Sequence, residues 1–272
     1  MNNFFTVVGV SYLALVGLLF SFQRNMLYFP DASVPSPVLS GVSEMSPVSL
    51  KTSDGLRLLA WYKSASRGRP TLVFFHGNAG NIGGRGFKAR PFLDAGYGLL
   101  LVEYRGYGGN PGSPSEEGFF ADGRAARDFL ASQGVSPRLT VLYGESLGTG
   151  VAVKMASEMA GESPAGALIL EAPYTSIADV AAYHYWYAPV RLLIKDAFDS
   201  ASLIAGVKSP IFIIHGDSDN TIPTKFGRRL FELAQEPKES LWVPGAGHNE
   251  IYAFNGAAAV LDFLKRQTWS IK

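Results

Sequence analysis

The chain has 272 residues, a length that suits one large domain, and its 24 Lys and Arg nearly balance its 23 Asp and Glu. This balance lacks the basic excess of nucleic-acid binders, so we expect no nucleic-acid partner. The sequence has no cysteine, which excludes a disulfide framework, a thiolate metal site and a cysteine nucleophile.

An apolar segment comes first. Residues 4–22 carry no charged side chain, and as a helix rising about 1.5 Å per residue they nearly match a hydrocarbon layer of ~30 Å. We therefore expect a single-pass membrane anchor over residues 1–27. A cleaved signal peptide and a buried or interfacial helix are the alternatives, but no Lys or Arg precedes the segment and no small-x-small cleavage site follows it. Arg24 alone lies close to the segment, so the side of the membrane is not indicated.

Two features follow the anchor. Residues 28–47 are rich in Ser, Pro and Gly and predict a linker or a surface crossing. Two β-prone runs, 48–50 and 56–62, then flank the turn-forming tetrapeptide TSDG, and they predict an antiparallel hairpin at a sheet edge. We place the start of the main domain, residues 48–272, at this hairpin.

Near-continuous apolar runs alternate with helical patterns over the rest of the chain. Such runs are typical of parallel strands buried on both faces and joined by helical crossovers. They occur at 71–75, 99–104, 139–143, 167–170, 210–214 and 241–243, with helical patterns at 117–133, after 148 and near 251–265. The sequence therefore predicts an α/β fold with a mostly parallel central sheet, helices on both faces and a preceding hydrophobic helix. Ligands of such folds gather at the carboxyl ends of the strands.

The segment at about 176–204 breaks this alternation because it is too long for a simple connection. It is rich in aromatic residues, including Tyr183, Trp186 and Tyr187. We expect a helical, cap-like insertion over the strand ends, with these three side chains forming a substrate wall. The alternative is a helix pair packed into the core without substrate contact.

A candidate nucleophile lies in GESLG, where Ser146 is flanked by Gly144 and Gly148. An apolar run precedes the motif and a helical pattern follows it, as at a nucleophile elbow, whose strained turn leaves room only for small neighbours. A serine hydroxyl is a poor nucleophile near neutral pH. It therefore needs a base within hydrogen-bonding reach and a carboxylate that orients this base.

Four histidines are available as the base. His76 and His215 each follow a strand and precede glycine, which suits a loop-shaping role, and His184 lies in the aromatic insertion. His248 lies in a small-residue loop after the last predicted strand. This position gives the Ser, acid, His order of α/β hydrolases, so we predict His248 as the base.

The acid and the oxyanion donors are sought at neighbouring strand ends. Asp217 and Asp219 follow the run 210–214, and we favour Asp219, because Asp217 suits a turn residue that bonds nearby backbone. The tetrahedral intermediate needs two N–H donors. Leu147 follows the nucleophile at a helix N-terminus, and Asn78 lies in the loop after an early strand. The alternative for that loop is a plain glycine turn.

Six stretches together carry a family resemblance: HGNAGN at 76–81, YRGYGGNPGSPSEEG at 104–118, GESLG at 144–148, EAPYTS at 171–176, HGDSDNTIP at 215–223 and GAGHNE at 245–250. From about residue 25 to 270 the chain resembles the α/β-hydrolase superfamily, and within it the Bem46-like group of single-pass membrane serine hydrolases. The resemblance implies a triad of Ser146, Asp219 and His248, with Asn78 and Leu147 as oxyanion donors. Such relatives include acyl-thioesterases of lipidated proteins, lipases and esterases. Glu103 replaces an expected Asp at a position that is not catalytic in the resemblance.

We thus expect a membrane-anchored serine hydrolase that cleaves carboxylic esters or thioesters of small-molecule, lipid or acylated substrates through an acyl-enzyme. The alternatives are a serine peptidase of the same fold and a non-catalytic, membrane-tethered binding protein. GxGxxG and HExxH patterns are missing from the sequence, so we expect no cofactor and no metal. The acyl chain length, the leaving group and the oligomeric state are not indicated by the sequence.

Overall fold

The computed structural model describes residues 2–161 and 163–269. Within them the main strands are β2 (Ser46–Lys51), β3 (Arg57–Lys63), β4 (Thr71–Phe75), β6 (Gly98–Val102), β7 (Thr140–Glu145), β8 (Ala167–Glu171), β9 (Ile211–Gly216) and β10 (Lys238–Val243). They form one sheet in the order β10-β9-β8-β7-β4-β6-β3-β2. Strands β10 to β6 run parallel, and β3 is antiparallel to both β6 and β2. The predicted mostly parallel sheet is thus confirmed, and so is the hairpin at its edge.

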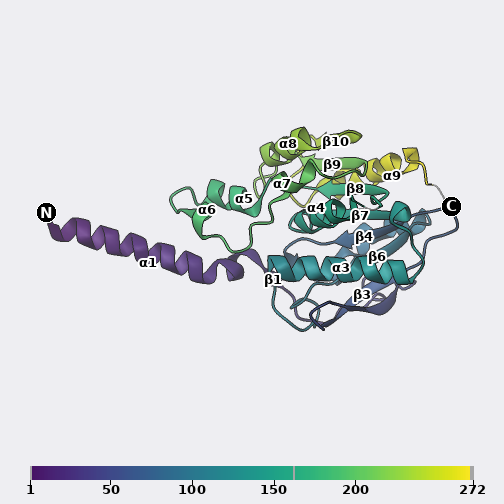
Figure 1. Ribbon diagram of the computed structural model, residues 1–272, viewed down its shortest axis with the longest axis horizontal. Helices are drawn as coiled ribbons and strands as arrows, with labels where there is room; N and C mark the ends of the chain where they lie inside the picture. Colours follow the sequence, from purple (N-terminus) through teal and green to yellow (C-terminus); the bar gives the residue numbers. More distant parts are fainter. Residues whose placement is uncertain (1, 162, 270–272) are drawn as a thin grey trace.

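Helices cover both faces of this sheet (Figure 1). They are α2 (Gly86–Asp94), α3 (Glu116–Ser132), α4 (Gly148–Met159), α7 (Ser200–Ile204), α8 (Thr224–Leu233) and α9 (Gly256–Arg266). Buried side chains of α3, α4, α7 and α8 join the apolar cluster on one face, and those of α2 and α9 join the cluster on the other. The sheet is therefore the middle of three layers.

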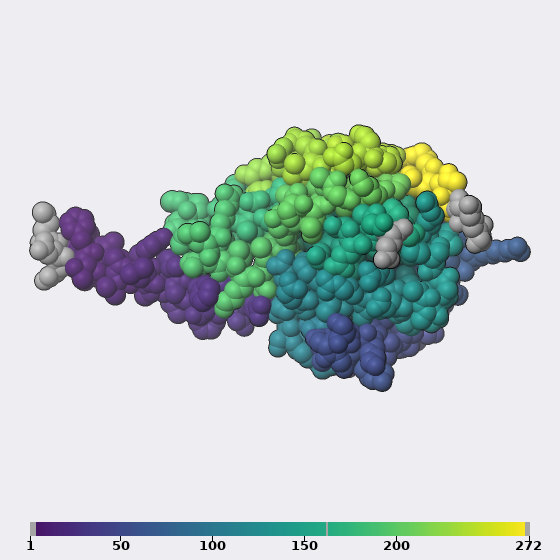
Figure 2. All heavy atoms as spheres, viewed as in Figure 1, coloured from purple at the N-terminus to yellow at the C-terminus, as the bar shows by residue number. Residues whose placement is uncertain are grey.

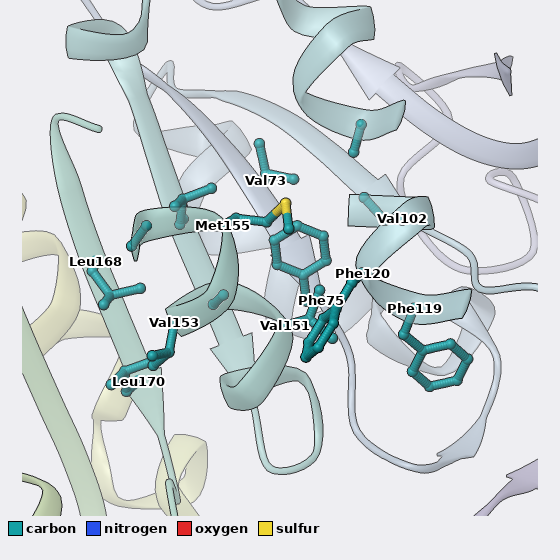
Figure 3. Close-up of a cluster of buried hydrophobic side chains, with 14 of the residues drawn as sticks. Val73, Phe75, Val102, Phe119, Phe120, Val151, Val153, Met155, Leu168 and Leu170 are labelled. Atoms are coloured by element: carbon teal, nitrogen blue, oxygen red, sulfur yellow. The ribbon is translucent and has the colours of Figure 1, made fainter. Parts of the chain in front are cut away.

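The buried strands explain why their sequences read as continuous apolar runs. Successive residues of a strand point to opposite faces, and in β4 Val73 and Phe75 belong to one apolar cluster while Leu72 and Phe74 belong to the other. Figure 3 shows the first of these clusters, in which Val73 and Phe75 lie near Met155 of α4. With helices on both sides, both sets of side chains must be apolar.

Two expected boundaries differ in the structure. The second apolar run predicts a strand over 99–104, but β6 ends at Val102, because Glu103 and Tyr104 leave the ladder to enter a turn. The last helix was expected from about residue 251, but a short 3-10 turn, Ile251–Phe254, comes first. Asn255 then adopts a left-handed conformation with φ of 62°, which interrupts the helix before α9 begins.

The segment between the first helix and the sheet runs along the domain in fixed contacts. The short strand β1 (Phe29–Pro30) pairs with β5 (Ala79–Gly80). Tyr28, Val42 and Met45 are buried in the apolar clusters. Residues 28–47 therefore cross the surface of the domain with these three side chains packed into its core.

The first helix, α1 (Asn2–Leu27), projects from the domain, as Figures 1 and 2 show. Its span Phe4–Leu27 has 24 residues and a mean hydropathy of 2.1, so it is long and apolar enough to cross a membrane. The insertion at 176–204 holds α5 (Ile177–His184) and α6 (Val190–Leu193), which lie beside α1, followed by α7. Ile204 of α7 is buried in the core, so only the first two helices of the insertion lie outside it.

Candidate active site

Ser146 lies on the sharp turn between β7 and α4. Its φ of 51° is in the left-handed region, which costs an L-residue roughly 1–2 kcal/mol. Two backbone bonds hold the turn: the Ser146 N–H donates to the Glu171 carbonyl at 2.8 Å, and the Thr149 N–H donates to the Ser146 carbonyl at 2.9 Å. A Cβ at Gly148 would overlap the carbonyl of Phe75, and one at Gly144 would overlap Thr149. The glycines of the motif are therefore steric requirements.

The structure brings together the three residues predicted as nucleophile, base and acid. The Ser146 Oγ lies 2.9 Å from the His248 Nε2, and the His248 Nδ1 lies 2.6 Å from the Asp219 Oδ2. An ionised carboxylate only accepts hydrogen bonds, so the Nδ1 atom carries the proton and the Nε2 lone pair faces the serine hydroxyl. In this arrangement His248 can take the proton from Ser146.

Asp219 is held as an anion by several donors. Its Oδ1 accepts the N–H groups of Thr221 at 2.9 Å and Ile222 at 2.8 Å. Its Oδ2 also lies 3.1 Å from the Nε2 of buried His215. Burial by itself raises the pKa of Asp219, but the hydrogen bonds from His215 and His248, with the charge of His248, hold that pKa below its ordinary value. Asp219 therefore remains ionised beside the imidazole.

Two further residues, His215 and Asp217, hold the loop that contains Asp219. His215 was predicted only as a loop-shaping residue, and its contact with Asp219 could not be read from the sequence, since the side chain of a residue at a strand end can face several loops. Asp217, predicted as a turn residue, accepts the Gly245 N–H at 2.7 Å. This bond joins the loop of Asp219 to the loop that carries His248.

Asn78 and Leu147, the predicted oxyanion donors, line the same pocket as Ser146. The Asn78 side chain donates to the Leu27 carbonyl at 2.9 Å. The Asn78 carbonyl accepts the Phe29 N–H at 2.9 Å and the Tyr107 hydroxyl at 2.8 Å. These three bonds fix the residue without using its backbone N–H. Asn78 thus joins this loop to the end of α1.

Buried Glu103 holds the loop that contains Asn78 through two hydrogen bonds. Its Oε1 lies 3.0 Å from the His76 Nε2, and its Oε2 accepts the Ile82 N–H at 2.9 Å. All three groups are buried. The glutamate that departs from the expected Asp therefore ties both ends of the loop that contains Asn78.

A buried charge cluster lies beneath the nucleophile turn. The Lys88 ammonium contacts Glu145 at 3.0 Å and Glu171 at 2.6 Å, and Arg85 contacts Glu145 at 3.1 Å. Burial would raise the pKa of Glu145, but the charges of Lys88 and Arg85 lower it to about 2. The same carboxylates raise the pKa of Lys88 against its burial. The cluster was not predicted, because its members are far apart in the sequence.

A pocket of about 600 Å³ opens at Ser146. Its lining is mostly apolar and comes from two sources. One wall is formed by Val16, Leu19, Phe20, Gln23, Met26 and Leu27 of α1, and the facing wall includes Ile177, Val180, Ala181, His184, Tyr185 and Leu193 of the insertion. The described residues include no group of three or more His, Cys, Asp or Glu placed to hold a metal ion.

The aromatic residues predicted to form a substrate wall lie elsewhere. Tyr183 and Trp186 line a shallow depression on the outer side of the insertion, beside Lys225 and Phe226. Trp186 is 81% exposed, and the Tyr187 carbonyl accepts a hydrogen bond from Tyr12 of α1. The expected insertion is therefore present, but the pocket is lined by other residues of it. Val180, Ala181 and His184 share the face of α5 that turns toward Ser146, and Tyr183 projects from another face.

No family model matches the chain. It is 39% identical to the uncharacterized protein Rv2307c of Mycobacterium tuberculosis, over 96% of this chain and 92% of that protein. Protein bem46 of Schizosaccharomyces pombe is 32% identical over 94% of this chain and 90% of its own length. Alpha/beta hydrolase domain-containing protein 17B of Xenopus tropicalis is 35% identical over 74% of this chain and 68% of its own length.

Solved structures share the fold. The Pyrococcus furiosus esterase Pf2001 superposes with a TM-score of 0.70 at 20% identity, covering 89% of this chain and 98% of the esterase. A monoacylglycerol lipase of Paleococcus ferrophilus gives a TM-score of 0.59 at 17% identity, covering 81% of this chain and 98% of the lipase. With the fold and the similarity to bem46 and protein 17B together, the chain belongs to the Bem46-like group of the α/β-hydrolase superfamily.

Proposed function

We propose that this protein is a membrane-anchored serine hydrolase that cleaves carboxylic esters or thioesters with an acyl or lipid-like chain. The observation that carries the proposal is the hydrogen-bonded series Ser146, His248, Asp219, with distances of 2.9 and 2.6 Å, at the end of an apolar pocket. Nucleophile, base and acid stand in the order that acyl transfer requires. Residues 1–27 act as the anchor, 28–47 cross the surface and 48–272 form the catalytic domain.

The chemistry follows from these positions. The Ser146 Oγ attacks the carbonyl carbon while the His248 Nε2 takes the hydroxyl proton. The N–H groups of Asn78 and Leu147 bind the oxyanion that forms. The intermediate collapses, His248 gives its proton to the departing alcohol or thiol, and an acyl-Ser146 remains. Water, deprotonated by His248, then releases the carboxylic acid and restores the serine.

The pocket supports an acyl substrate, because its lining is mostly apolar and such surfaces bind hydrocarbon in preference to polar groups. The same lining favours an acyl chain over a peptide, whose amides would lose their hydrogen bonds to water. The fold that the chain shares with an esterase and a lipase also supports the proposal of ester hydrolysis. The apolar span Phe4–Leu27 supports the membrane anchor.

A fluorophosphonate probe tests the nucleophile directly. We expect the full-length protein to be labelled and Ser146→Ala to be unlabelled. Ser132→Ala, at an exposed serine at the end of α3, is the matched control and should keep the label. Asp219→Asn should lower kcat on a short acyl ester by about 10⁴-fold, because the imidazole would lose its correct tautomer. Labelling that survives in Ser146→Ala would overturn the assignment.

A further inference from the structure

One face of α1 is half-buried although the rest of the helix is exposed. Between Phe4 and Leu27 the partly buried residues are Val16, Leu19, Gln23 and Leu27. Their spacing of three or four residues places them on one side of a helix. All four line the pocket that contains Ser146. The face of α1 that the domain covers is thus the face that lines the pocket.

The insertion holds α1 in this position through bonds along its length. The Tyr12 hydroxyl donates to the Tyr187 carbonyl at 3.0 Å. Gln23 donates to the Leu193 carbonyl at 3.2 Å and accepts the Lys195 N–H at 2.7 Å. Three contacts spread over three turns fix both the rotation and the height of the helix. A helix that served only as a tether would have no need for a fixed rotation.

We propose that α1 is a wall of the acyl-binding site, and that the tail of a membrane lipid or lipidated substrate lies along it from Ser146 toward Val16. This inference rests on the proposed hydrolase function. It assigns Leu19 and Val16 as residues that determine the accepted chain length. The bilayer, rather than water, is then the source from which the tail enters the pocket.

The length of α1 between Leu27 and Val16 matches the length of a lipid tail. Leu27 is tied to Asn78 beside Ser146, and Val16 marks the far end of the half-buried face. At 1.5 Å per residue, the distance from Leu27 to Val16 along the helix is about 16 Å. One leaflet of a hydrocarbon layer of ~30 Å has about the same depth, which is the length of a lipid tail. The part of the pocket near Val16 therefore lies at the depth of the membrane tails.

The pocket lining changes from polar near Ser146 to apolar near Val16. Asn78 and Ser146 lie at one end and Val16, Leu19 and Phe20 at the other. Gln23 and Asp196 also line the pocket, but the Gln23 side chain is bonded to the Leu193 carbonyl and the Lys195 N–H, and the Asp196 carboxylate is neutralised by Arg24. A scissile ester thus meets polar groups, and its tail meets hydrocarbon.

Chain-length selectivity of the full-length protein in vesicles tests the proposal. Leu19→Trp enlarges a side chain that faces the pocket, and Leu18→Trp makes the same change at a 58% exposed position outside the lining. For Leu19→Trp, we expect the ratio of kcat/KM for a sixteen-carbon to a four-carbon acyl ester to fall about fifteenfold. Two displaced methylenes, at a factor of about four each, account for this loss. Leu18→Trp should keep the wild-type ratio.

A binding experiment separates this inference from the proposed function. The Ser146→Ala protein is placed in vesicles with a palmitoyl ester that carries a diazirine at the tail end, irradiated and mapped by mass spectrometry. We expect crosslinks at Val16 and Leu19 in excess over Leu18, and competition by excess palmitoyl ester. Equal crosslinking around α1, or a ratio unchanged in Leu19→Trp, would overturn the inference while ester hydrolysis stands. Selective crosslinks without hydrolysis of any ester by the wild type would overturn the hydrolase function instead.

Discussion

Arg24, in the last turns of α1, forms a two-point ion pair with Asp196 of the insertion. The Arg24 Nε lies 2.7 Å from Oδ2, and the Nη2 lies 3.0 Å from Oδ1. The arginine side chain is 47% exposed, whereas the aspartate side chain is 4% exposed. Asp196 also accepts the Glu116 N–H at 3.1 Å, at the start of α3. A single buried carboxylate therefore joins α1, the insertion and the start of α3.

We predict that Arg24→Ala lowers the stability of the full-length protein in detergent by about 1–2 kcal/mol. Breaking a buried pair costs about 3–5 kcal/mol, and the half-exposed arginine reduces this figure. Thermal unfolding measures the change. In an Asp196→Asn background the same substitution should cost much less, because no buried charge is left unpaired. An equal loss of stability in both backgrounds would show that the Arg24–Asp196 ion pair does not stabilise the protein.

The left-handed turn at Ser146 leads to a prediction on stability. Both Ser146→Gly and Ser146→Ala remove the hydroxyl, but only glycine adopts a φ of 51° without strain. Relief of about 1–2 kcal/mol of strain exceeds the entropy cost of about 0.5–1 kcal/mol that glycine brings. We therefore expect Ser146→Gly to be more stable than Ser146→Ala by about 0.5–1 kcal/mol in thermal or denaturant unfolding. Equal stability of the two variants would argue against strain at the turn.

The charge cluster of Lys88, Glu145 and Glu171 should make the stability of the protein depend on pH in the acidic range. The pKa of Glu145 is lowered from 4.5 to about 2, so its stabilising charge is present above its ordinary pKa and is lost as the pH falls toward 2. In Glu145→Gln we expect a lower unfolding temperature at pH 7 and a shallower decline between pH 6 and pH 3. Glu232→Gln, on the exposed side of α8, serves as control. Parallel curves for the wild type and Glu145→Gln would contradict the prediction.

The outer side of the insertion should contact lipid. Trp186 and Leu192 are 81% and 86% exposed on the insertion, whose helices α5 and α6 lie beside the apolar helix α1 (Figure 1), and exposed apolar patches mark interaction surfaces. In vesicles of brominated lipid we expect quenching of tryptophan fluorescence, of which Trp186→Phe removes a substantial part. Trp242→Phe, at the partly buried β10, should remove little. Unchanged quenching in Trp186→Phe would place the insertion outside the bilayer.

Local patterns were sufficient for the sheet and for the residues of the site. A strand buried on both faces needs a continuous apolar run, so five strands could be found in this way before any contact was known. Ser146, Asp219 and His248 could be singled out because each follows such a run, and parallel strands end at one edge. The structure places the three within hydrogen-bonding distance of one another.

Contacts between distant segments could not be predicted in the same way. The insertion has no clear period, so nothing in its sequence indicated that Val180 and His184 face the pocket while Tyr183 faces away. Nothing near Lys88 in the sequence indicates its carboxylate partners, which follow it by more than fifty positions. The sequence of α1 does not indicate that one face of the helix lines the pocket, because lipid and a protein pocket favour the same apolar side chains.

The bond from the Asn78 side chain to the Leu27 carbonyl links the end of α1 to the loop that contains a proposed oxyanion donor. A helix adapts to membranes of different thickness by tilting. Here the end of that helix is bonded to the residue that is proposed to hold the oxyanion, and Phe29 is bonded to the carbonyl of the same residue. In the proposed membrane-anchored hydrolase, we therefore expect membrane thickness to act on this loop through two short hydrogen bonds, so that the turnover rate depends on the bilayer as well as on the protein.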